Sequence, residues 1–336
     1  MLREAISILV QDISLSEEEM ALCMAEIMDG KATDAQIGAF LTALRLKGES
    51  VEEITGAARI MRKKSTRIKA PEGVIDTCGT GGDMAGTFNI STVTAIVVAA
   101  AGVPVAKHGN RSVSSKSGSA DVLEALGVRI DLPPEKVQST LFETNFGFLF
   151  APLFHPAMKF AIGPRREIGI RTVFNVLGPI TNPAGAKKQV LGVFSRDLTE
   201  PLAAVLGNLG AIDAMVVHGE DGLDEISICD GTRVSRYLMG TIDNFYITPE
   251  DFGFRRADIK SIAGGNRDEN ASIALSLLKG ETGPKRDIVL MNAAAALVVG
   301  GVTEMLTDAM EIASETIDSG KGLRKLEEIR KVTNAL

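Results

Sequence analysis

The residues with the clearest chemical potential form a glycine-rich segment and the start of the helix predicted after it. Gly79, Gly81 and Gly82 follow an apolar strand pattern that ends at Asp76. Glycine adopts positive φ without strain and lets backbone N–H groups reach an anion. Residues 89–92, Asn-Ile-Ser-Thr, precede an Ala- and Val-rich helical run, whose N-cap is the asparagine or the serine. The N–H groups and dipole at such a helix start favour phosphate.

Basic and hydroxyl-bearing residues follow the second predicted strand, 103–106. Lys107, His108 and Arg111 come directly after it, and serines recur from 112 to 119. In α/β folds, ligands bind at the carboxyl ends of parallel strands. These residues therefore strengthen the prediction of a phosphate site, although a solvated loop is the alternative for the two cations. The histidine fits a general base or a packed loop residue equally well.

Two adjacent acids, Asp224 and Glu225, lie in a turn close to Gly219 and Gly222. In a regular strand their side chains would face opposite ways, so sharing a site requires an irregular backbone or two metal ions between them. Hard oxygen ligands without a nearby His or Cys suit Mg²⁺. Solvated surface acids are the alternative. The planar guanidinium of Arg165 can bind a carboxylate through two parallel hydrogen bonds. An ordinary surface ion pair is the alternative interpretation.

The glycine-rich segment fits neither of two common nucleotide-binding loops. The G-x-G-x-x-G spacing of dinucleotide-binding loops is not met, because the sequence reads G-T-G-G-D-M. A Walker loop would need G-K followed by Ser or Thr, which is absent here. A tight strand-to-helix turn without a ligand is the remaining alternative, and the helix start beside it favours phosphate binding.

Five motifs, taken together, resemble one enzyme family. They are D-T-C-G-T-G-G-D, N-I-S-T, K-H-G-N-R-S-V-S-S-K-S-G-S-A-D, G-P-R-R and G-L-D-E-I-S. Their order and spacing resemble the anthranilate phosphoribosyltransferases, and the resemblance covers essentially the whole chain. It implies transfer of the phosphoribosyl group of 5-phosphoribosyl 1-diphosphate to the amino group of anthranilate. The products would be N-(5-phosphoribosyl)anthranilate and pyrophosphate, in tryptophan biosynthesis.

The resemblance also implies the roles of individual residues. Residues expected to bind 5-phosphoribosyl 1-diphosphate are Gly79, Gly82, Asp83, Thr87, Asn89, Ile90, Ser91, Thr92, Lys107, His108, Gly109, Asn110, Arg111, Ser112, Val113, Ser114, Ser115 and Ser119. Those expected to bind anthranilate are Gly79, Asn110 and Arg165. Two Mg²⁺ ions are expected on Ser91, Asp224 and Glu225, and the expected catalytic residues are Lys107, Asp224 and Glu225.

Composition and charge exclude several other classes of protein. The chain has 336 residues, 45% of them hydrophobic, and a net charge of −7, which argues against a general nucleic-acid binder. Its three cysteines have no metal-ligand spacing and are typical of reduced thiols in a cytoplasmic protein. No apolar run is long enough to span a bilayer, and no signal peptide pattern is present. We therefore expect a soluble, cytoplasmic protein.

The pattern of elements predicts an α/β fold with a small helical domain. Residues 1–70 contain three capping boxes, which begin at Ser16, Thr33 and Ser50. From residue 73 to 336, strand and helix patterns alternate, which predicts a mostly parallel central sheet. The family's fold implies that residues 157–185 rejoin the helical domain and that this domain forms a homodimer.

Further strands are predicted at 146–150, 189–194 and 213–217. Residues 223–248 read as β-rich, with turns at Asp230-Gly231 and Asp243-Asn244.

Two other functions compete with the transferase. A pyrimidine nucleoside phosphorylase resembles this fold, but its basic and serine pattern differs from K-H-G-N-R-S-V-S-S and it needs no Mg²⁺ pair. A non-enzymatic relative that binds nucleic acid would carry a basic groove and degraded 79–83 and 224–225 motifs. This chain is acidic and keeps both motifs, so the sequence favours the transferase.

Overall fold

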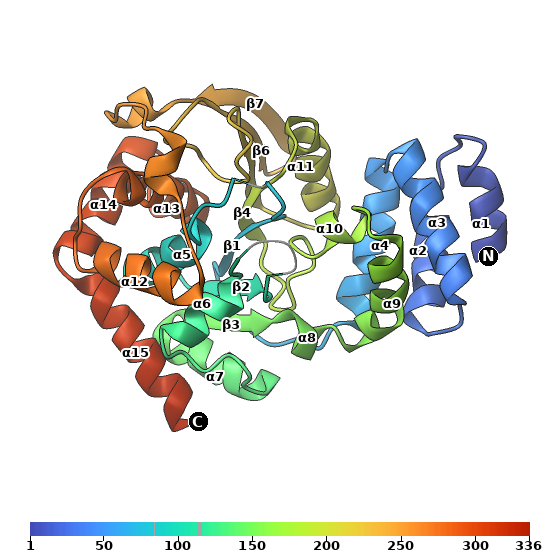
Figure 1. Cartoon of the computed structure of the whole chain (residues 1–336), viewed down its shortest axis with the longest axis horizontal. Helices are drawn as coiled ribbons and strands as arrows, with labels where there is room; N and C mark the ends of the chain where they lie inside the picture. The colour runs from blue at the N-terminus through green and yellow to red at the C-terminus, as the bar shows by residue number, and fades with distance from the viewer. Residues whose placement is uncertain (84, 113–115) are drawn as a thin grey trace.

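Four helices form the N-terminal part of the chain, which lies to one side of the molecule (Figure 1). The computed structural model describes residues 1–83, 85–112 and 116–336. The four helices are α1 (Leu2–Leu9), α2 (Glu17–Met28), α3 (Asp34–Lys47) and α4 (Val51–Lys64). The three predicted capping boxes are confirmed at the starts of α2, α3 and α4, where each cap side chain and the third residue of the helix bond one another's backbone.

The apolar stripe of α3 is buried, and later segments of the chain pack on the same bundle. Ile37, Phe40, Leu41 and Leu44 of this stripe are all fully or almost fully buried. α9 (Lys159–Ile168) packs on α3, and α10 (Phe174–Leu177) packs on α4. Segments more than a hundred residues apart therefore share one apolar core.

Within the described residues, seven strands form one sheet in the order β3-β2-β1-β4-β5-β6-β7. The strands are β1 (Ile75–Gly79), β2 (Val105–Gly109), β3 (Phe146–Phe150), β4 (Lys188–Gly192), β5 (Asp213–Gly219), β6 (Thr232–Leu238) and β7 (Thr241–Ile247). The first five in this order pair in parallel, and β6 and β7 extend the sheet with antiparallel pairing. The predicted α/β fold with a mostly parallel sheet is confirmed.

The register places the carboxyl ends of the parallel strands along one edge of the sheet. Gly79 at the end of β1 pairs with Gly192 at the end of β4. Gly109 at the end of β2 likewise pairs with Phe150 at the end of β3. The glycine-rich segment leaves the sheet at this edge, and so does the basic segment (residues 107–119) after Gly109, so they enter the same region of the molecule.

Helices cover both faces of the sheet. α5 (Ile90–Ala100) and α13 (Pro284–Gly300) pack together and contact β1, and Val190 of β4 belongs to their apolar core. Leu191, the next residue, belongs to the opposite core, which includes the N-terminal helices and α11 (Thr199–Asn208). This alternation follows from the period of two in a strand. In the part of the chain that the structure describes, no helix is long and apolar enough to cross a membrane.

The remaining helices surround the first core or the far end of the sheet (Figure 1). They are α6 (Ser119–Ala125), α7 (Pro134–Thr144), α8 (Ala151–Phe154), α12 (Arg267–Leu278), α14 (Leu306–Asp318) and α15 (Lys321–Ala335). α12, α14 and α15 all contact α5, and α7 packs on β3. α5 is thereby enclosed on several sides, which fixes its N-terminus at the carboxyl edge of the sheet.

One predicted turn is wrong. Asp243-Asn244 lies inside β7, and the hairpin turn is Met239-Gly240, between the paired residues Leu238 and Thr241. Both turn residues have positive φ, 44° and 105°, which matches the twist of the flanking strands in a two-residue hairpin. Methionine is an unusual residue for this conformation, so the sequence pattern pointed to the polar pair instead.

Candidate active site

The glycine-rich segment forms a turn between the ends of β1 and β4. Gly81 and Gly82 have φ of 68° and 78°, so positive φ is confirmed at these two positions. The N–H of Thr80 donates to the carbonyl of Gly192 at 2.9 Å, and its Oγ1 accepts from the N–H of Phe194 at 3.0 Å. These bonds fix the turn across the ends of β1 and β4. The residues after Thr80 line the candidate site.

The acidic pair lies in the segment 220–231, which between β5 and β6 forms neither helix nor strand. Oδ2 of Asp224 accepts from the N–H of Gly81 at 2.6 Å. Oε1 of Glu225 accepts from the N–H of Ser91, in the first turn of α5, at 3.1 Å. The irregular backbone therefore lets two adjacent carboxylates reach the glycine turn and the helix start together.

Close backbone packing holds this segment against β4. A Cβ atom on Gly192 would lie 1.6 Å from the carbonyl oxygen of Asp224. Such a distance is impossible without moving one of the two backbones. Gly192 is therefore required for the approach of Asp224, a role that its position at a strand end does not reveal in the sequence.

The side chain of Lys107 is buried close to the acidic pair. Its Nζ donates to the carbonyl of Thr77 at 2.5 Å and to Oγ of Ser91 at 3.2 Å. Burial lowers the pKa of Lys107, and the charges of nearby acids, Asp76 first among them, oppose that shift. Lys107 and Glu225 thus both contact Ser91, one through its hydroxyl and the other through its N–H.

Asp76 is the principal counter-charge of Lys107, and the sequence interpretation gave it no role. It is fully buried in β1 and accepts from the N–H of His108 at 3.3 Å and from Nδ2 of Asn182 at 2.8 Å. Burial raises its pKa to about 6, against the lowering effects of Lys107 and these bonds. A single acid within an apolar strand was the available signal, since such a residue needs a partner.

The electrostatics of the acidic pair suit a cation. Burial raises the pKa of Asp224 well above its usual value, and the neighbouring charge of Glu225 raises it further. Burial also raises the pKa of Glu225, with Lys107 acting in the opposite direction. A divalent cation would offset both the burial and the repulsion. The oxygens of Asp224, Glu225 and Ser91 are hard donors of the kind Mg²⁺ prefers.

The protein alone supplies few ligands for such an ion. Among the residues that the structure describes, no cluster of three or more His, Cys, Asp or Glu side chains could hold a metal. Mg²⁺ commonly keeps waters and binds through one or two carboxylates plus substrate phosphate. The donor set therefore fits an ion that arrives with a phosphorylated substrate.

Asn89 occupies the N-cap position of α5, but its side chain does not cap the helix. Its Nδ2 donates to the carbonyl of Ser117 at 3.2 Å, and its Oδ1 accepts from Nδ2 of Asn270 at 3.0 Å. Ile90 and Thr92 in the same turn are buried, so only their backbone groups can face a ligand. Asn89 instead ties this turn to the basic segment and to α12.

Other residues of the predicted site lie around the glycine turn. Asp83 accepts at Oδ1 from the N–H of Ala85 at 3.2 Å. Thr87 forms an isolated antiparallel bridge with Ala263. Gly79 ends β1, where a Cβ would lie 2.3 Å from Oδ2 of Asp224. These contacts bring the 79–92 segment against the acidic pair.

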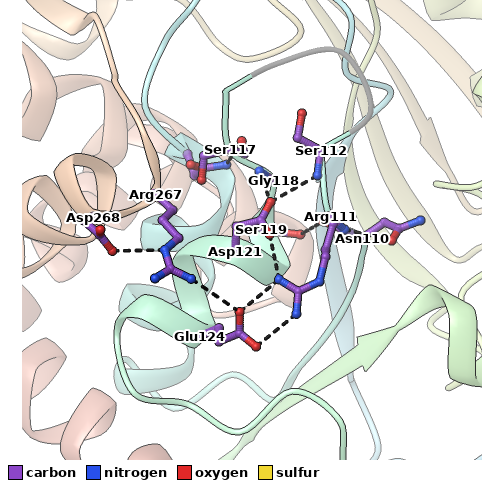
Figure 2. Close-up of polar contacts among 11 residues, drawn as sticks. Asn110, Arg111, Ser112, Ser117, Gly118, Ser119, Asp121, Glu124, Arg267 and Asp268 are labelled. Atoms are coloured by element: carbon purple, nitrogen blue, oxygen red, sulfur yellow. Dashed lines mark hydrogen bonds and ion pairs between the residues drawn. The ribbon is translucent and has the colours of Figure 1, made fainter.

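The side chain of Arg111 points toward α6 (Figure 2). The sequence predicts instead that Arg111 contacts the phosphorylated substrate. Its guanidinium donates to Oδ1 of Asp121 at 2.8 Å and to both oxygens of Glu124 at 2.9 Å. These acids raise its pKa, Glu124 most strongly. Arg267 of α12 also lies 4.0 Å from Glu124. The charge of Arg111 is thus already paired.

Asp121 also bonds the backbone of the basic segment at two points. Its Oδ2 accepts from the N–H of Ser112 at 3.2 Å and from that of Gly118 at 2.9 Å (Figure 2). Between these two residues, the predicted contacts Val113, Ser114 and Ser115 lie outside the described residues.

Asn110 and Ser119 lie close together at the same place. Oδ1 of Asn110 accepts from the N–H of Arg111 at 2.8 Å, and its carbonyl accepts from Oγ of Ser119 at 3.4 Å. Gly109 ends β2 directly before them.

Two buried histidines lie side by side below the basic segment. The rings of His108 and His155 have centroids 5.0 Å apart. Nδ1 of His108 lies 3.1 Å from the carbonyl of Gly178, so this nitrogen donates and Nε2 is left as an acceptor. Burial lowers the pKa of His108 to about 3 and that of His155 to about 4. A ring with so low a pKa is a weak proton acceptor near pH 7, which favours a packed residue over a general base at position 108.

Arg165 lies in α9, and its side chain is half-buried. Its guanidinium lies over the ring of Phe174, 4.9 Å from the ring centroid. Burial lowers its pKa. Within the described residues, no hydrogen bond or ion pair engages its guanidinium. An unpaired, partly desolvated guanidinium is suited to bind a carboxylate.

Besides Asp76, sequence reasoning missed three side chains that hold this arrangement. Arg171 donates to the carbonyl of Gly82 and lies over the ring of Phe194. Asn182 joins Asp76 to the carbonyl of Ala106. The third is Asn292, which bonds the backbone of Ile226, and it is the one polar residue in the apolar stretch 288–299. That isolation was its only signal in the sequence.

Comparisons with known proteins agree with this architecture. Residues 71–323 match the glycosyl transferase family a/b domain, and residues 3–65 match that family's helical bundle domain. The anthranilate phosphoribosyltransferase of Acetivibrio thermocellus is 55% identical over 336 residues, which cover 100% of this chain and 97% of that protein.

Solved structures give the same result. The crystal structure of anthranilate phosphoribosyltransferase from Thermus thermophilus has a TM-score of 0.93 and 43% identity, with 98% of this chain and 99% of that chain covered. The enzyme from Saccharomyces cerevisiae in complex with PRPP and Mg has a TM-score of 0.91 and 29% identity, with 100% and 98% covered. By its matched domains and its full-length relatives, the chain belongs to the anthranilate phosphoribosyltransferase family.

Proposed function

We propose that this chain transfers the phosphoribosyl group of 5-phosphoribosyl 1-diphosphate to the amino group of anthranilate, in tryptophan biosynthesis. The observation that carries the proposal is the buried contact of the acidic pair with two phosphate-binding elements. Asp224 bonds the glycine turn, Glu225 bonds the first turn of α5, and Lys107 lies beneath them. The names of the relatives support the choice of substrates.

The phosphoribosyl site is proposed to follow the 79–92 and 107–119 segments. The N–H groups of Thr80 and Gly81 already bond Gly192 and Asp224, so the backbone N–H groups that follow them in the glycine turn would contact pyrophosphate. Arg111 would contribute through the backbone of its segment, because Asp121 and Glu124 already bind its guanidinium. Ser119 would bind the 5-phosphate with its hydroxyl.

Magnesium is the proposed cofactor, as two ions on Ser91, Asp224 and Glu225. The raised pKa values of the two acids and their hard oxygen donors support this assignment. The yeast relative's complex with PRPP and Mg supports it as well. When bound, Mg²⁺ supplies charge that stabilises the departing pyrophosphate.

The reaction forms a bond between the anthranilate nitrogen and C1 of the ribose, while the bond from C1 to the pyrophosphate oxygen breaks. The amine attacks from the face opposite the leaving group, so C1 inverts. The ribose passes through an oxocarbenium-like state, and Lys107 with the backbone N–H groups of the turn stabilises the leaving charge. The amine releases its proton after bonding, so the neutral His108 is not needed as a base.

Anthranilate is proposed to bind through its carboxylate to Arg165, with Asn110 and Gly79 nearby. The guanidinium of Arg165 is half-buried and free of acidic partners within the described part of the chain. Orientation of the amine toward C1 would follow from this pairing, and orientation is itself a large part of catalysis in such transfers.

The division into domains and the assembly are also proposals. The helical domain would comprise residues 1–70 with about 157–185, and the α/β domain the rest of 73–336. Packing of α9 on α3 supports this division. A homodimer through the helical domain is supported by Leu22 and Leu46, which are 56% and 83% exposed. A cytoplasmic location remains a prediction from the three free thiols.

The test follows anthranilate fluorescence after 5-phosphoribosyl 1-diphosphate is added. We expect loss of fluorescence with Mg²⁺ and none with excess EDTA. Asp224→Asn should lower kcat by about 10²–10³-fold, as expected for the loss of a group that stabilises transition-state charge. Arg165→Ala should raise the KM for anthranilate. A flat signal in every condition, with phosphorolysis of pyrimidine nucleosides instead, would contradict the proposal.

A further inference from the structure

Asn292 is a buried polar residue in a helix segment that is otherwise apolar. It lies on α13, between Ile288 and Val299, and is 2% exposed. α13 packs on α5, β1, β4 and β5, in the interior of the α/β part of the molecule (Figure 1). A buried amide costs free energy unless its hydrogen bonds are made, and asparagine is a poor helix former. Its presence here therefore needs a specific partner.

That partner is the residue that follows the acidic pair. Oδ1 of Asn292 accepts from the N–H of Ile226 at 3.0 Å, and Nδ2 donates to the carbonyl of Ile226 at 2.9 Å. Nδ2 also donates to the carbonyl of Ile288 at 2.9 Å. The amide of Asn292 thus pairs with both backbone groups of one residue, as a neighbouring strand would.

No strand is available to do so, because the 220–231 segment is irregular. In the part of the chain that the structure describes, Asn292 is the only side chain of the covering helices that bonds the backbone of 224–227. Two further contacts of residues 224–227 come from the sheet: Thr232 accepts from the N–H of Ser227, and Gly192 makes room for Asp224. Asn292 fixes the opposite side.

Asn292 also borders the site itself. It lines one small cavity together with Glu225, Ser91 and Thr94. The fixed backbone of Ile226 determines where the chain leaves Glu225, and Glu225 must reach the N–H of Ser91 while Asp224 reaches Gly81. A rotation of this backbone would separate the two carboxylates, as in a regular strand.

We propose that Asn292 is a positioning residue for the acidic pair, which holds Asp224 and Glu225 in one site through its bonds to Ile226. The inference rests on the proposed function for the identity of the ligands, magnesium and pyrophosphate. It adds a residue of α13 to the set on which that site depends.

Two variants test it. Asn292→Ser can keep a bond to the carbonyl of Ile288 but reaches neither group of Ile226. Asn292→Leu keeps the branching and the number of heavy atoms of the side chain and loses all three bonds. Thr333→Val is the matched control, because Thr333 is a buried helix residue whose hydroxyl bonds the carbonyl of Ile329 on α15. All three variants retain every residue proposed to touch a substrate.

The primary measurement is Mn²⁺ binding in the presence of inorganic pyrophosphate, followed by electron paramagnetic resonance. We expect at least a tenfold loss of Mn²⁺ affinity in both Asn292 variants and none in Thr333→Val. The second measurement is the Mg²⁺ concentration for half-maximal transferase activity, which should rise at least tenfold. The KM for anthranilate should stay within twofold, because Arg165 lies on α9 and shares no contact with Asn292.

A merely structural amide predicts a different result. Lower thermal stability with unchanged Mn²⁺ affinity would overturn the proposal. So would failure of both Asn292 variants to fold while Thr333→Val folds, since the residue would then serve the core alone. If the wild-type protein had no transferase activity but bound Mn²⁺ with pyrophosphate, the proposed function would fail and the metal-binding comparison would still decide the role of Asn292.

Discussion

Lys107 and Arg111 are four residues apart in one basic motif, but they occupy different environments. Lys107 lies within β2, 1% exposed, with its Nζ between the carbonyl of Thr77 and the hydroxyl of Ser91. The side chain of Arg111 is 44% exposed and binds two acids of α6 (Figure 2). The strand therefore places its cation beside the acidic pair, whereas the segment after the strand uses a cation to bond α6.

The position of each residue in the fold explains the difference. β2 lies between β1 and β3, so side chains at its carboxyl end are enclosed by neighbouring strands and by the covering helix. Beyond Gly109 the chain leaves the sheet, and the nearest charges are those of α6. A charge that is desolvated interacts more strongly with its partners than one in water. The comparison leads us to predict that Lys107 acts on the reaction and that Arg111 acts on the conformation of its segment.

The largest effect is expected for Lys107→Met. The substitution keeps most of the length of the side chain and removes its charge, so one of the groups proposed to offset the charge of the leaving pyrophosphate is lost. We expect kcat to fall by about 10²–10³-fold, the usual cost of losing one preorganised stabilising group. Steady-state kinetics by anthranilate fluorescence would measure it, with exposed Lys279→Met as the control. A loss below threefold would place both cations of the motif in the same supporting role.

A pH effect on stability tests the burial of the strand end. Burial lowers the pKa of His155 to about 4, against about 6.5 in an unfolded chain. Between pH 6.5 and about pH 4, the imidazole is protonated in the unfolded state and neutral in the folded state. The unfolding free energy therefore decreases as the pH is lowered through this range. Between pH 6 and 4.5, the unfolding free energy of His155→Asn should fall less steeply than that of the wild type, by about 1 kcal/mol per pH unit.

Urea denaturation followed by circular dichroism at several pH values would measure these slopes. Asp76 acts in the opposite direction, because its pKa is raised to about 6 and its contribution is lost as the pH rises. His108, with a pKa lowered to about 3, acts in the same direction as His155. Both groups are present in the two proteins, so they largely cancel in the difference. Parallel slopes would mean that His155 is solvated.

Local signals in the sequence were enough for much of the fold. Each capping box of α2, α3 and α4 is a bond between residues three apart, and all three form as predicted. The predicted strand 146–150 matches β3 in full. The sequence also held a signal for the orientation of the Arg111 side chain. Asp121 and Glu124 are three residues apart, on one face of a helix that begins shortly after Arg111.

The supporting contacts of the site could not be predicted in the same way. Asn182 meets Asp76 across 106 positions in the chain, Arg171 meets Gly82 across 89, and Asn292 meets Ile226 across 66. Each pair is brought together by the order of strands and helices, which no local pattern specifies. The motifs therefore identified the residues expected at the ligand, and the fold had to show which residues hold them in place.

The smallest effect is expected for Arg111→Met, and it completes the comparison. Its guanidinium is paired at the surface, where ion pairs contribute little to stability, so the unfolding free energy should change by about 1 kcal/mol or less. The bonds that fasten the segment to α6 would weaken, and the KM for 5-phosphoribosyl 1-diphosphate should rise by about threefold to tenfold with kcat nearly unchanged. Glu124→Gln should reproduce this pattern in the same assay in weaker form, since it removes one of the two charges that Arg111 meets. If Arg111→Met instead lowered kcat as much as Lys107→Met, its guanidinium would have to leave α6 and bind the leaving group during the reaction.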